Sequence, residues 1–401
     1  MRDLTFMEKF FQSHAYMLSH LNAPVQRSLM DRIDWSHRMI GIRGPRGVGK
    51  TTFLLQYAHD HFDPQLQQCL YISMNNFYFQ GRGIVEFTED FVRYGGRVLL
   101  IDQVFKQPNY AADLVECYRR FDKLHIIYAT SSVIPPDSEA QRELNRISDV
   151  YVLHGFSFRE FVNSQTGLNF RSYSLNEILE GHEQILKTIL PKVRPWNYFQ
   201  DYLHHGYYPF FLETHNFTEQ LLKSINMMIE VDILFIKQID LKYLARIRKL
   251  LYLLGMEGIT APNVTKLADE IGTSRATVMN YIKDLEEARL VNLVYREGEE
   301  FPKKPVQIMI HNTNLLYAIS SRNAEEQEVM ETFFANSVWR HHNVSKGKGK
   351  RTGSYIIDGH NIVVCDKSRR FKAQDGVYFA RYNAEVGHGT DIPLWLFGFL
   401  H

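Results

Sequence analysis

The sequence is poor in the features that mark secreted, metal-binding and membrane proteins. It has 3 cysteines, Cys69, Cys117 and Cys365, among 401 residues. They are too few and too scattered for a disulfide framework or a cysteine metal site, so we expect buried thiols in a reducing compartment. No apolar run approaches the length of a membrane-spanning helix, and the charged N-terminus MRDLTFMEKFFQSH lacks the apolar centre of a signal peptide. We therefore expect a cytoplasmic protein without a membrane partner.

An excess of charge of one sign is also absent. The chain carries 46 basic and 45 acidic residues, for a net charge of +1, so no global field favours nucleic acid or a membrane surface. Hydrophobic residues make up 45% and charged residues 23%, which is typical of a globular protein with a core. A chain of 401 residues is too long for one ordinary domain and suggests two or three.

A phosphate-binding loop follows the first predicted strand. Apolar residues 39–42 lead into GPRGVGKT at 44–51 and then into a helical stretch, which is the pattern G-x-x-x-x-G-K-[ST] in its strand–loop–helix context. The glycines let backbone N–H groups point inward, where they and the helix N-terminus hold a phosphate. We expect Lys50 to bridge the β- and γ-phosphates and the Thr51 hydroxyl to be a Mg²⁺ ligand. The predicted nucleotide-binding residues are Gly44, Pro45, Arg46, Gly47, Val48, Gly49, Lys50, Thr51 and Thr52.

A second strand supplies the carboxylate that such a loop needs. The run VLLID at 98–102 ends in Asp102, which we expect to organise the Mg²⁺ shell together with Thr51. Further strands are predicted from Cys69 and over 124–132, and helical stretches separate them. This alternation predicts an α/β fold with a parallel sheet flanked by helices. Nucleotide would then bind at the carboxyl edge of the strands.

The motifs together resemble the bacterial and archaeal AAA+-type P-loop ATPases that carry an uncharacterised, restriction-endonuclease-like C-terminal domain. The resemblance rests on GPRGVGKTT, VLLIDQV, KQPNY, IIYATSS, RISDVYVLHGFSFREF, HHGYYPFFLE and DIPLWLFGFL, which span most of the chain. It implies an ATPase with ATP and Mg²⁺ as cofactors. It implies that Arg146 contacts the γ-phosphate or acts as an arginine finger, with an ordinary surface arginine as the alternative. It also makes Ser131 and Ser132 the hydroxyls that follow the strand.

One residue of the second motif departs from the family. Gln103 stands where the resemblance implies a glutamate that polarises the attacking water. Glutamine can hydrogen-bond that water but cannot accept its proton, and loss of such a base typically costs about 10²–10⁴-fold in rate. We therefore expect ATP to bind and hydrolysis to be slow or blocked. Two origins fit: natural divergence, since Phe105 also departs from the family's histidine, or an introduced substitution that traps ATP.

We expect four parts in the chain. An ATPase core at 1–165 is followed by an α-helical lid at 166–250, whose apolar residues recur at helical spacing. A winged helix-turn-helix at 251–300 follows, and a nuclease-like α+β domain at 301–401 ends the chain. The second helix of the helix-turn-helix would offer Arg275, Thr277, Asn280 and Lys283 to DNA, whereas a rigid packing module is the alternative.

The nuclease-like domain lacks the residues of a working nuclease. Glu331 fits the helix glutamate that such a site needs, but Ser354 and Val364 stand where the resemblance implies acidic metal ligands. We therefore expect no nuclease activity. A basic surface is predicted instead, with an ordinary solvated loop as the alternative; its residues are Lys346, Lys348, Lys350, Arg351, Arg369, Arg370 and Lys372.

Three functions fit these observations. The first is an ATP-binding conformational switch with slow or absent hydrolysis. The second is an ATP-controlled DNA-binding protein that uses the winged helix and the basic surface. The third is a scaffold whose partner is another protein or a second copy of this chain.

Overall fold

The chain folds into two compact units, Met1–His154 and Gly155–His401. The computed structural model describes residues 2–213, 216–320, 322–347, 353–369 and 376–400. Five of the residues predicted to form the basic surface lie outside this range: Lys348, Lys350, Arg351, Arg370 and Lys372.

Unit 1 (Met1–His154) contains a five-stranded sheet in which every described pairing is parallel. The strand order is β2 (Cys69–Ser73), β3 (Val98–Asp102), β4 (His125–Thr130), β1 (Met39–Arg43) and β5 (Asp149–Val152). Residues of β3 and most of those of β1, β2 and β4 are buried, as expected for strands covered on both faces. The parallel sheet predicted from the sequence is confirmed.

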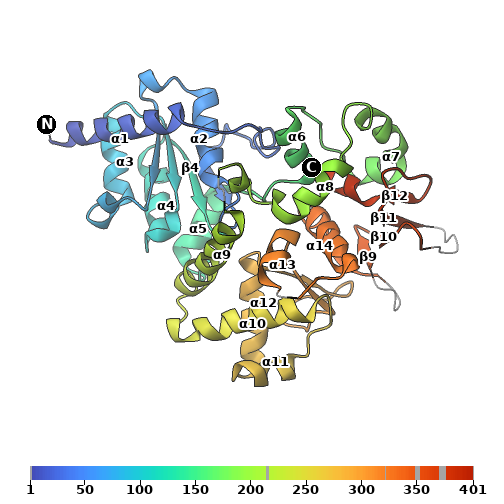
Figure 1. The fold of residues 1–401 in the computed structure, drawn as a ribbon. Helices are drawn as coiled ribbons and strands as arrows, with labels where there is room; N and C mark the ends of the chain where they lie inside the picture. The colour runs from blue at the N-terminus through green and yellow to red at the C-terminus, as the bar shows by residue number, and fades with distance from the viewer. Residues whose placement is uncertain (1, 214–215, 321, 348–352, 370–375, 401) are drawn as a thin grey trace. The chain divides into compact units, whose positions relative to one another are not determined.

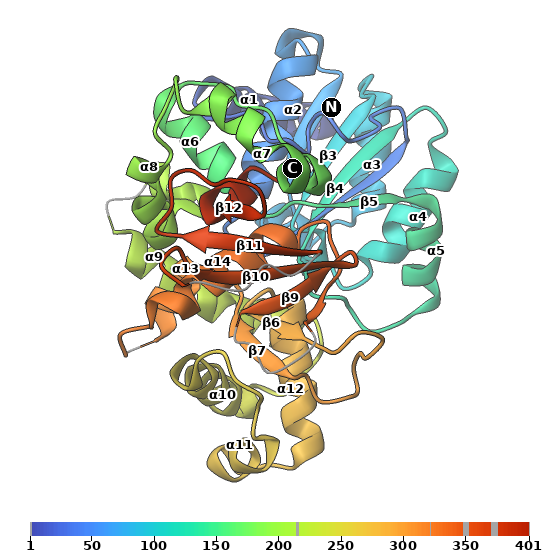
Figure 2. The same cartoon turned by 90° about the vertical axis from the view of Figure 1, so that its right-hand side faces the viewer.

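The helices of unit 1 cover both faces of this sheet (Figures 1 and 2). Right-handed crossovers place α2 on one face, because the chain moves from β1 to the far edge strand β2. The later crossovers run back in the opposite direction and place α3, α4 and α5 on the other face. The helices are α1 (Arg2–Ser19), α2 (Lys50–His61), α3 (Ile84–Arg93), α4 (Tyr110–Arg120) and α5 (Glu139–Ile147), with short 3₁₀ turns at Pro64–Leu66, Phe77–Gln80 and Val104–Lys106.

Unit 2 (Gly155–His401) begins with a set of helices. They are α6 (Phe158–Thr166), α7 (Leu175–Ile189), α8 (Trp196–Asp201) and α9 (Phe217–Met227), with π-helical segments at Tyr202–Gly206 and Met228–Phe235 and 3₁₀ turns at Pro209–Leu212 and Leu241–Tyr243. Capping boxes fix the starts of α6 and α7, where Ser157 pairs with Glu160 and Ser174 with Glu177. The helices predicted from Leu175 and from Phe217 are confirmed.

The initial helices of unit 2 pack against its C-terminal residues. Phe158 of α6 lies 5.2 Å from Phe199, 6.4 Å from Phe333 and 6.0 Å from Phe399, measured between ring centroids. Phe158, Phe199 and Phe399 are each completely buried. In this cluster, a helix of the expected lid and the end of the chain therefore share one core. The four-part division of the sequence stays a prediction.

A helix–turn–helix and a strand pair follow in the middle of unit 2. Helix α10 (Leu244–Glu257) precedes α11 (Val264–Ile271) and α12 (Arg275–Glu287), and β6 (Val291–Val294) pairs antiparallel with β7 (Gln307–Ile310). Gly272, at a φ of 65°, ends α11, and the Ser274 side chain caps α12 by accepting from the backbone N–H of Thr277. The order of elements agrees with the sequence pattern, whereas the winged-helix interpretation stays a prediction.

The end of unit 2 is a mixed five-stranded sheet. Its strand order is β12 (Asp391–Pro393), β11 (Val377–Tyr382), β10 (His360–Asp366), β9 (Ser354–Ile357) and β8 (Val344–Lys346). The β9–β10 hairpin is antiparallel with Asp358 and Gly359 at the bend, as the sequence predicts. Two helices precede the sheet and a 3₁₀ segment follows it: α13 (Thr313–Ile319), α14 (Glu326–Val338) and Leu394–Phe399.

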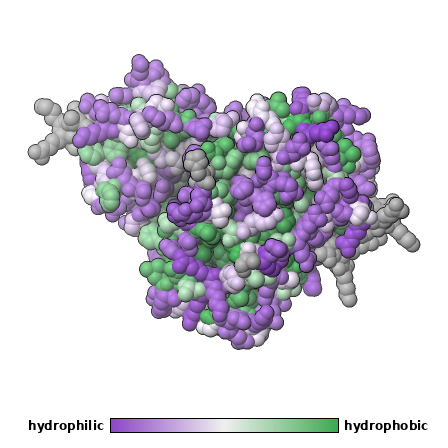
Figure 3. All heavy atoms as spheres, viewed as in Figure 1, coloured by the Kyte–Doolittle hydropathy of each residue, from purple (hydrophilic) through white to green (hydrophobic). Residues whose placement is uncertain are grey.

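The apolar and hydrophilic residues are sorted as expected. Large aromatic side chains such as Trp395, Phe397 and Tyr208 are fully buried, and hydrophilic residues cover most of the face in Figure 3. All three cysteines are free and buried, which confirms the prediction of buried thiols. None of the helices within the described ranges combines the length and the apolarity needed to cross a bilayer.

Candidate nucleotide-binding site

The loop between β1 and α2 has the conformation that its glycines permit. Gly47 and Gly49 have φ angles of 84° and 90°, values that glycine adopts without the strain of a side chain. At Gly44 a Cβ atom would lie 2.4 Å from the Leu153 carbonyl oxygen at the end of β5. Glycine is therefore required at Gly44 by close packing and at the other two positions by backbone conformation.

Lys50 already points into the loop. Its Nζ atom donates hydrogen bonds to the carbonyl oxygens of Gly44 at 2.7 Å and Pro45 at 2.8 Å. Lys50 is also the first residue of α2, so the positive end of the helix dipole lies at the same place. An ammonium group and a helix N-terminus that meet at one loop form an anion-binding site.

Thr51 and Asp102 come together as the sequence predicts. The Thr51 hydroxyl donates to Asp102 Oδ2 at 2.6 Å, across 51 positions of sequence. Asp102 ends the buried strand β3 and is 1% exposed. A hydroxyl and a carboxylate are oxygen ligands of the kind that Mg²⁺ prefers. These two residues therefore fit the magnesium ion that the loop implies.

Tyr71 is a member of this site that the sequence did not reveal. Its hydroxyl, on the adjacent strand β2, donates to Asp102 Oδ2 at 2.9 Å. Burial and the neighbouring Asp102 carboxylate raise the pKa of Tyr71, so its hydroxyl keeps its proton and remains a donor. Asp102 Oδ2 thus accepts from two hydroxyls, which fixes the orientation of the carboxylate. The contact follows from the pairing register of β2 and β3, which the sequence alone does not give.

Gln103 follows directly in an uncommon backbone conformation. Its φ is 56°, in the left-handed region that non-glycine residues seldom adopt, and its backbone N–H donates to Asp102 Oδ1 at 2.8 Å. Such a conformation costs on the order of 1–3 kcal/mol and tends to occur at functional sites. The turn places Gln103 at the carboxyl end of β3, next to the carboxylate expected to organise the metal.

A second unpredicted residue, Arg27, contacts the loop through hydrogen bonds to backbone carbonyls. Its guanidinium donates from Nη1 to the Val48 carbonyl at 3.0 Å and from Nη2 to the His154 carbonyl at 2.6 Å. Arg27 is 7% exposed. No motif marks this arginine in the sequence, because both of its acceptors are backbone atoms that any residue could supply.

The predicted residues after β4 and in α5 have different surroundings. Ser131 and Ser132 are both buried; the Ser131 hydroxyl oxygen accepts from the Val133 N–H at 3.2 Å, whereas Ser132 Oγ has no partner within the described part of the chain. Arg146 lies in the last turn of α5 and is exposed. Ser131 and Arg146 therefore stay candidates for catalytic roles, and Ser132 has the hydroxyl with unused hydrogen-bonding capacity.

The four residues predicted to face DNA lie along α12. Arg275 and Asn280 are exposed, but the Thr277 hydroxyl pairs with Ser274 Oγ at 2.9 Å. Lys283 forms an ion pair with Glu286 at 2.6 Å. Half of the expected contact set is thus already engaged in local interactions.

Glu331 is buried in unit 2 with neutral partners. Gln327 Nε2 donates to Glu331 Oε1 at 2.8 Å and the Tyr355 hydroxyl donates to Oε2 at 2.5 Å. Burial raises the pKa of the Glu331 carboxyl above its usual range. Ser354 and Val364 bring no carboxylate to the site, and no group of three metal-ligating side chains occurs among the residues that the structure describes. The absence of nuclease activity stays a prediction from the sequence.

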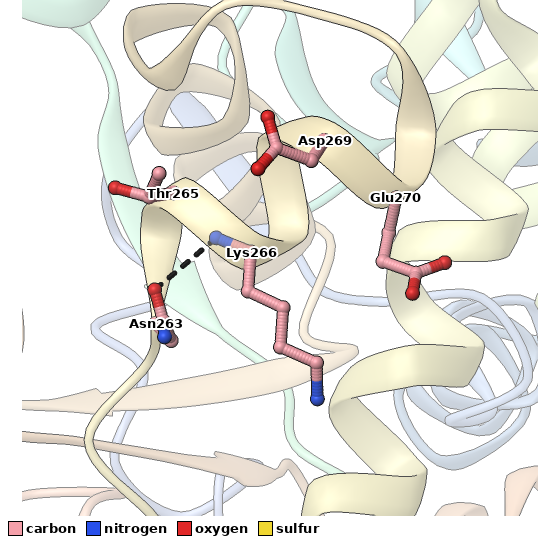
Figure 4. A pocket seen from close by; sticks show the side chains of 5 residues that line it. All are labelled: Asn263, Thr265, Lys266, Asp269 and Glu270. Atoms are coloured by element: carbon pink, nitrogen blue, oxygen red, sulfur yellow. Dashed lines mark hydrogen bonds between the residues drawn. The ribbon is translucent and has the colours of Figure 1, made fainter.

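A shallow pocket on α11 is lined mainly by polar and charged side chains. It has a volume of about 570 Å³, and Figure 4 shows its five lining side chains spread along α11 and pointing in different directions. Asn263 Oδ1 accepts from the Lys266 N–H at 3.1 Å, as an ordinary helix cap. Lys266 pairs with Glu257 at 3.6 Å and Glu270 with Lys249 at 3.4 Å, so local pairs engage two of the pocket's three charged residues.

Comparisons with known proteins agree with the site in unit 1. Residues 36–162 match the family model described as an AAA domain, and residues 197–309 match a domain of unknown function, DUF8612. The chain is 25% identical over 279 residues to an uncharacterized protein of Methanocaldococcus jannaschii, a match that covers 65% of this chain. It spans only 57% of the length of that relative.

Two solved structures show weak similarity. A katanin chain is 16% identical with a TM-score of 0.25, over 47% of this chain and 66% of that chain. PCH-2 of C. elegans is 15% identical with a TM-score of 0.24, over 71% of this chain and 67% of that chain. These TM-scores are too low to carry weight. The AAA-domain match, with the parallel sheet and the phosphate-binding loop, supports a nucleotide-binding domain of the AAA ATPase type in unit 1.

Proposed function

We propose that this chain is an ATP-dependent conformational switch of the cytosol that binds ATP with Mg²⁺ in unit 1 and hydrolyses it slowly or not at all. The observation that carries the proposal is the 2.6 Å contact between Thr51 and Asp102 beside the loop that holds Lys50. This contact places the two proposed oxygen ligands of Mg²⁺, Thr51 and Asp102, next to Lys50, the residue proposed to bind the phosphates.

The chain's own residues divide the work of binding. Lys50 would exchange its two carbonyl acceptors for phosphate oxygens, and the backbone N–H groups of 47–51 would hold the rest of the phosphate chain. Thr51 and Asp102 would hold the Mg²⁺, which neutralises phosphate charge when bound. Tyr71 keeps Asp102 in position from the neighbouring strand.

Gln103 explains why turnover is expected to be slow. Its position after Asp102 is where an attacking water needs a proton acceptor, and an amide cannot take the proton. Binding does not need that proton transfer, so ATP would remain intact in the site. The switch would then be set by ATP occupancy and reset by release or by a partner.

The test measures ATP turnover in this chain and in Gln103→Glu, with the bound nucleotide identified after purification. Restoring the carboxylate should raise turnover by about 10²–10⁴-fold, and this chain should retain intact ATP. Lys50→Ala, placed in the Gln103→Glu background, is the control that assigns the activity to this site. If Gln103→Glu leaves turnover unchanged while ATP still binds, Gln103 is not the residue that limits hydrolysis.

Arg146 suits a role between copies of the chain better than within one. It is exposed in the last turn of α5, so a neighbouring copy's phosphates could reach it. An arginine supplied in this way stabilises charge on the transferring phosphoryl group. In the active Gln103→Glu background, Arg146→Ala should lower turnover with a dependence on protein concentration, measured over a dilution series. A rate that stays concentration-independent in both proteins would contradict an intermolecular role.

A further inference from the structure

Unit 2 contains a polar groove that neither the nucleotide site nor the sequence motifs explain. It has a volume of about 720 Å³, within the range of about 300–1,000 Å³ usual for ligand pockets. Three segments line it: the end of α12, the β6–β7 connection, and the residues that follow α14. The lining residues that matter are Lys283, Arg289, Tyr295, Phe301, Trp339 and Arg340.

Hydrogen bonds hold the walls of this groove in place. The Lys346 N–H donates to the Tyr295 carbonyl at 2.8 Å, and Tyr295 and Ser345 form a parallel bridge. The β6–β7 connection is thereby attached to the C-terminal sheet at β8. On the other wall, Arg340 Nη2 donates to the Phe156 carbonyl at 2.8 Å. The groove is thus formed by backbone-anchored segments within one unit.

Lysine and arginine residues outnumber acidic residues in the lining of the groove. Lys283, Arg289 and Arg340 line it together with two acidic residues, Glu286 and Glu300. Lys283 is paired with Glu286 at 2.6 Å. The Arg289 side chain makes no hydrogen bond or ion pair within the described residues. Arg340 Nε and Tyr295 Oη are buried there without a hydrogen-bonding partner, so they lie beneath the surface of the groove. Arg289 is therefore the cation of the groove that remains available to a ligand within the described residues.

Aromatic rings accompany these cations. Tyr295 and Phe301 lie on the β6–β7 connection and Trp339 follows α14, and all three line the groove. Lys283 Nζ lies 6.0 Å from the Phe301 ring centroid. Rings beside guanidinium groups suit a ligand with flat bases and phosphates, because bases stack on rings while phosphates pair with cations. The carboxylates of an acidic peptide would pair with the cations but would not stack on the rings.

We propose that this groove binds single-stranded nucleic acid, with bases stacked on Trp339 and Phe301 and a phosphate held by Arg289. The site differs from the surface predicted along α12, because Arg275 and Asn280 do not line the groove and only Lys283 is shared. It does not rest on ATP binding, since every lining residue belongs to unit 2.

The experiment measures fluorescence anisotropy of a labelled oligothymidylate with the full chain at low salt. Arg289 has a φ of 60°, so Arg289→Asn removes the guanidinium and keeps a residue that tolerates this conformation. The affinity should fall by about tenfold, and the slope of log K against log salt should decrease by about 0.7 for the lost phosphate contact. Arg296→Ala is the matched control, because Arg296 is exposed on the same connection and outside the lining.

A second readout uses the tryptophan itself. Stacking of a base should quench Trp339 fluorescence, and Trp339→Phe should abolish that part of the quench while leaving a ring that still supports binding. Arg275→Ala should bind like the unchanged chain. The proposal is overturned by an oligothymidylate that does not bind at low salt. Binding that Arg289→Asn leaves intact, or complete competition by polyglutamate at equal charge, would overturn it as well.

Discussion

Each unit buries a carboxylate against a tyrosine hydroxyl, and the two pairs have different surroundings. In unit 1, Asp102 accepts from Tyr71 at 2.9 Å and from Thr51 at 2.6 Å beside the phosphate-binding loop. In unit 2, Glu331 accepts from Tyr355 at 2.5 Å and from Gln327 at 2.8 Å. The local motif is nearly the same, so the motif alone cannot define a site.

The difference lies in the groups that the neighbours can offer to a ligand. Asp102 lies beside the Thr51 hydroxyl, which can ligate a cation, and beside a loop whose lysine and backbone N–H groups can bind an anion. Glu331 has Ser354 and Val364 on the strands where further carboxylates would be needed, and burial raises its pKa. A buried carboxylate thus becomes useful only when other oxygen ligands converge on it; otherwise it is a cost to folding.

The largest expected effect is a difference in ATP affinity between variants of the two carboxylates, Asp102 and Glu331. Asp102→Asn removes the charge that we propose orders the cation, so Mg²⁺-dependent affinity for ATP should fall by about tenfold to a hundredfold, in line with about 1.5–3 kcal/mol for a hydrogen bond to a charged group. Glu331→Gln should leave that affinity unchanged. Calorimetric titration with and without Mg²⁺ measures both, and an equal loss in the two variants would refute the contrast.

A smaller effect compares the two tyrosines. Tyr355→Phe leaves the buried Glu331 with one donor fewer, so the free energy of unfolding of unit 2 should fall by about 1–3 kcal/mol. Tyr71→Phe leaves Asp102 with Thr51 and the Gln103 N–H, and should cost unit 1 about 0.5–1.5 kcal/mol. Urea titrations followed by circular dichroism provide both values. A larger loss for Tyr71→Phe would reverse the ranking.

The pH dependence of Glu331 sharpens the comparison further. Burial raises the pKa of the folded carboxyl above its unfolded value of 4.5, so the folded state binds the proton more tightly. Its contribution to stability is therefore full below pH 4.5 and is lost as the pH rises through the folded pKa. Glu331→Gln should make unit 2 more stable than the unchanged chain at pH 7, and the difference should shrink on acidification. Unfolding midpoints measured from pH 5 to 8 test this, and a destabilised variant at pH 7 would contradict it.

The smallest effect concerns the thiols, which should respond alike in the two units. Burial raises the pKa of Cys69 and Cys117 to about 12 and that of Cys365 to about 11. Because the thiolate is the reactive form, native protein should react slowly with iodoacetamide at pH 8, and 3 thiols should react after unfolding in urea. Mass spectrometry counts the adducts. Rapid labelling of one native thiol would show that its unit opens locally.

The sequence predicted those parts of the molecule that depend on local pattern. The loop at 44–51, the strands β1 to β4 and the β9–β10 hairpin follow from glycine spacing, apolar runs and an Asp-Gly bend. Thr51 and Asp102 could be paired in advance because the motif itself specifies their meeting. The helices from Leu175 and Phe217 follow from their apolar spacing.

The parts that could not be predicted depend on contacts between distant residues. Tyr71 meets Asp102 only because β2 and β3 pair in one register, and Arg27 reaches backbone carbonyls 21 and 127 positions away. Tyr355 meets Glu331 through the packing of a helix on a sheet. The groove of unit 2 needs three segments that share no motif. Composition and residue spacing do not indicate which distant residues come into contact.

Arg27 gives the phosphate-binding loop a mechanical connection. One planar guanidinium holds the carbonyl of Val48, inside the loop, and the carbonyl of His154, where the chain leaves unit 1. A rigid fork cannot follow a displacement of one acceptor without loading its bond to the other. An occupant of the loop that displaces the Val48 carbonyl would therefore strain the bond from Arg27 to the His154 carbonyl, at the last residue of unit 1.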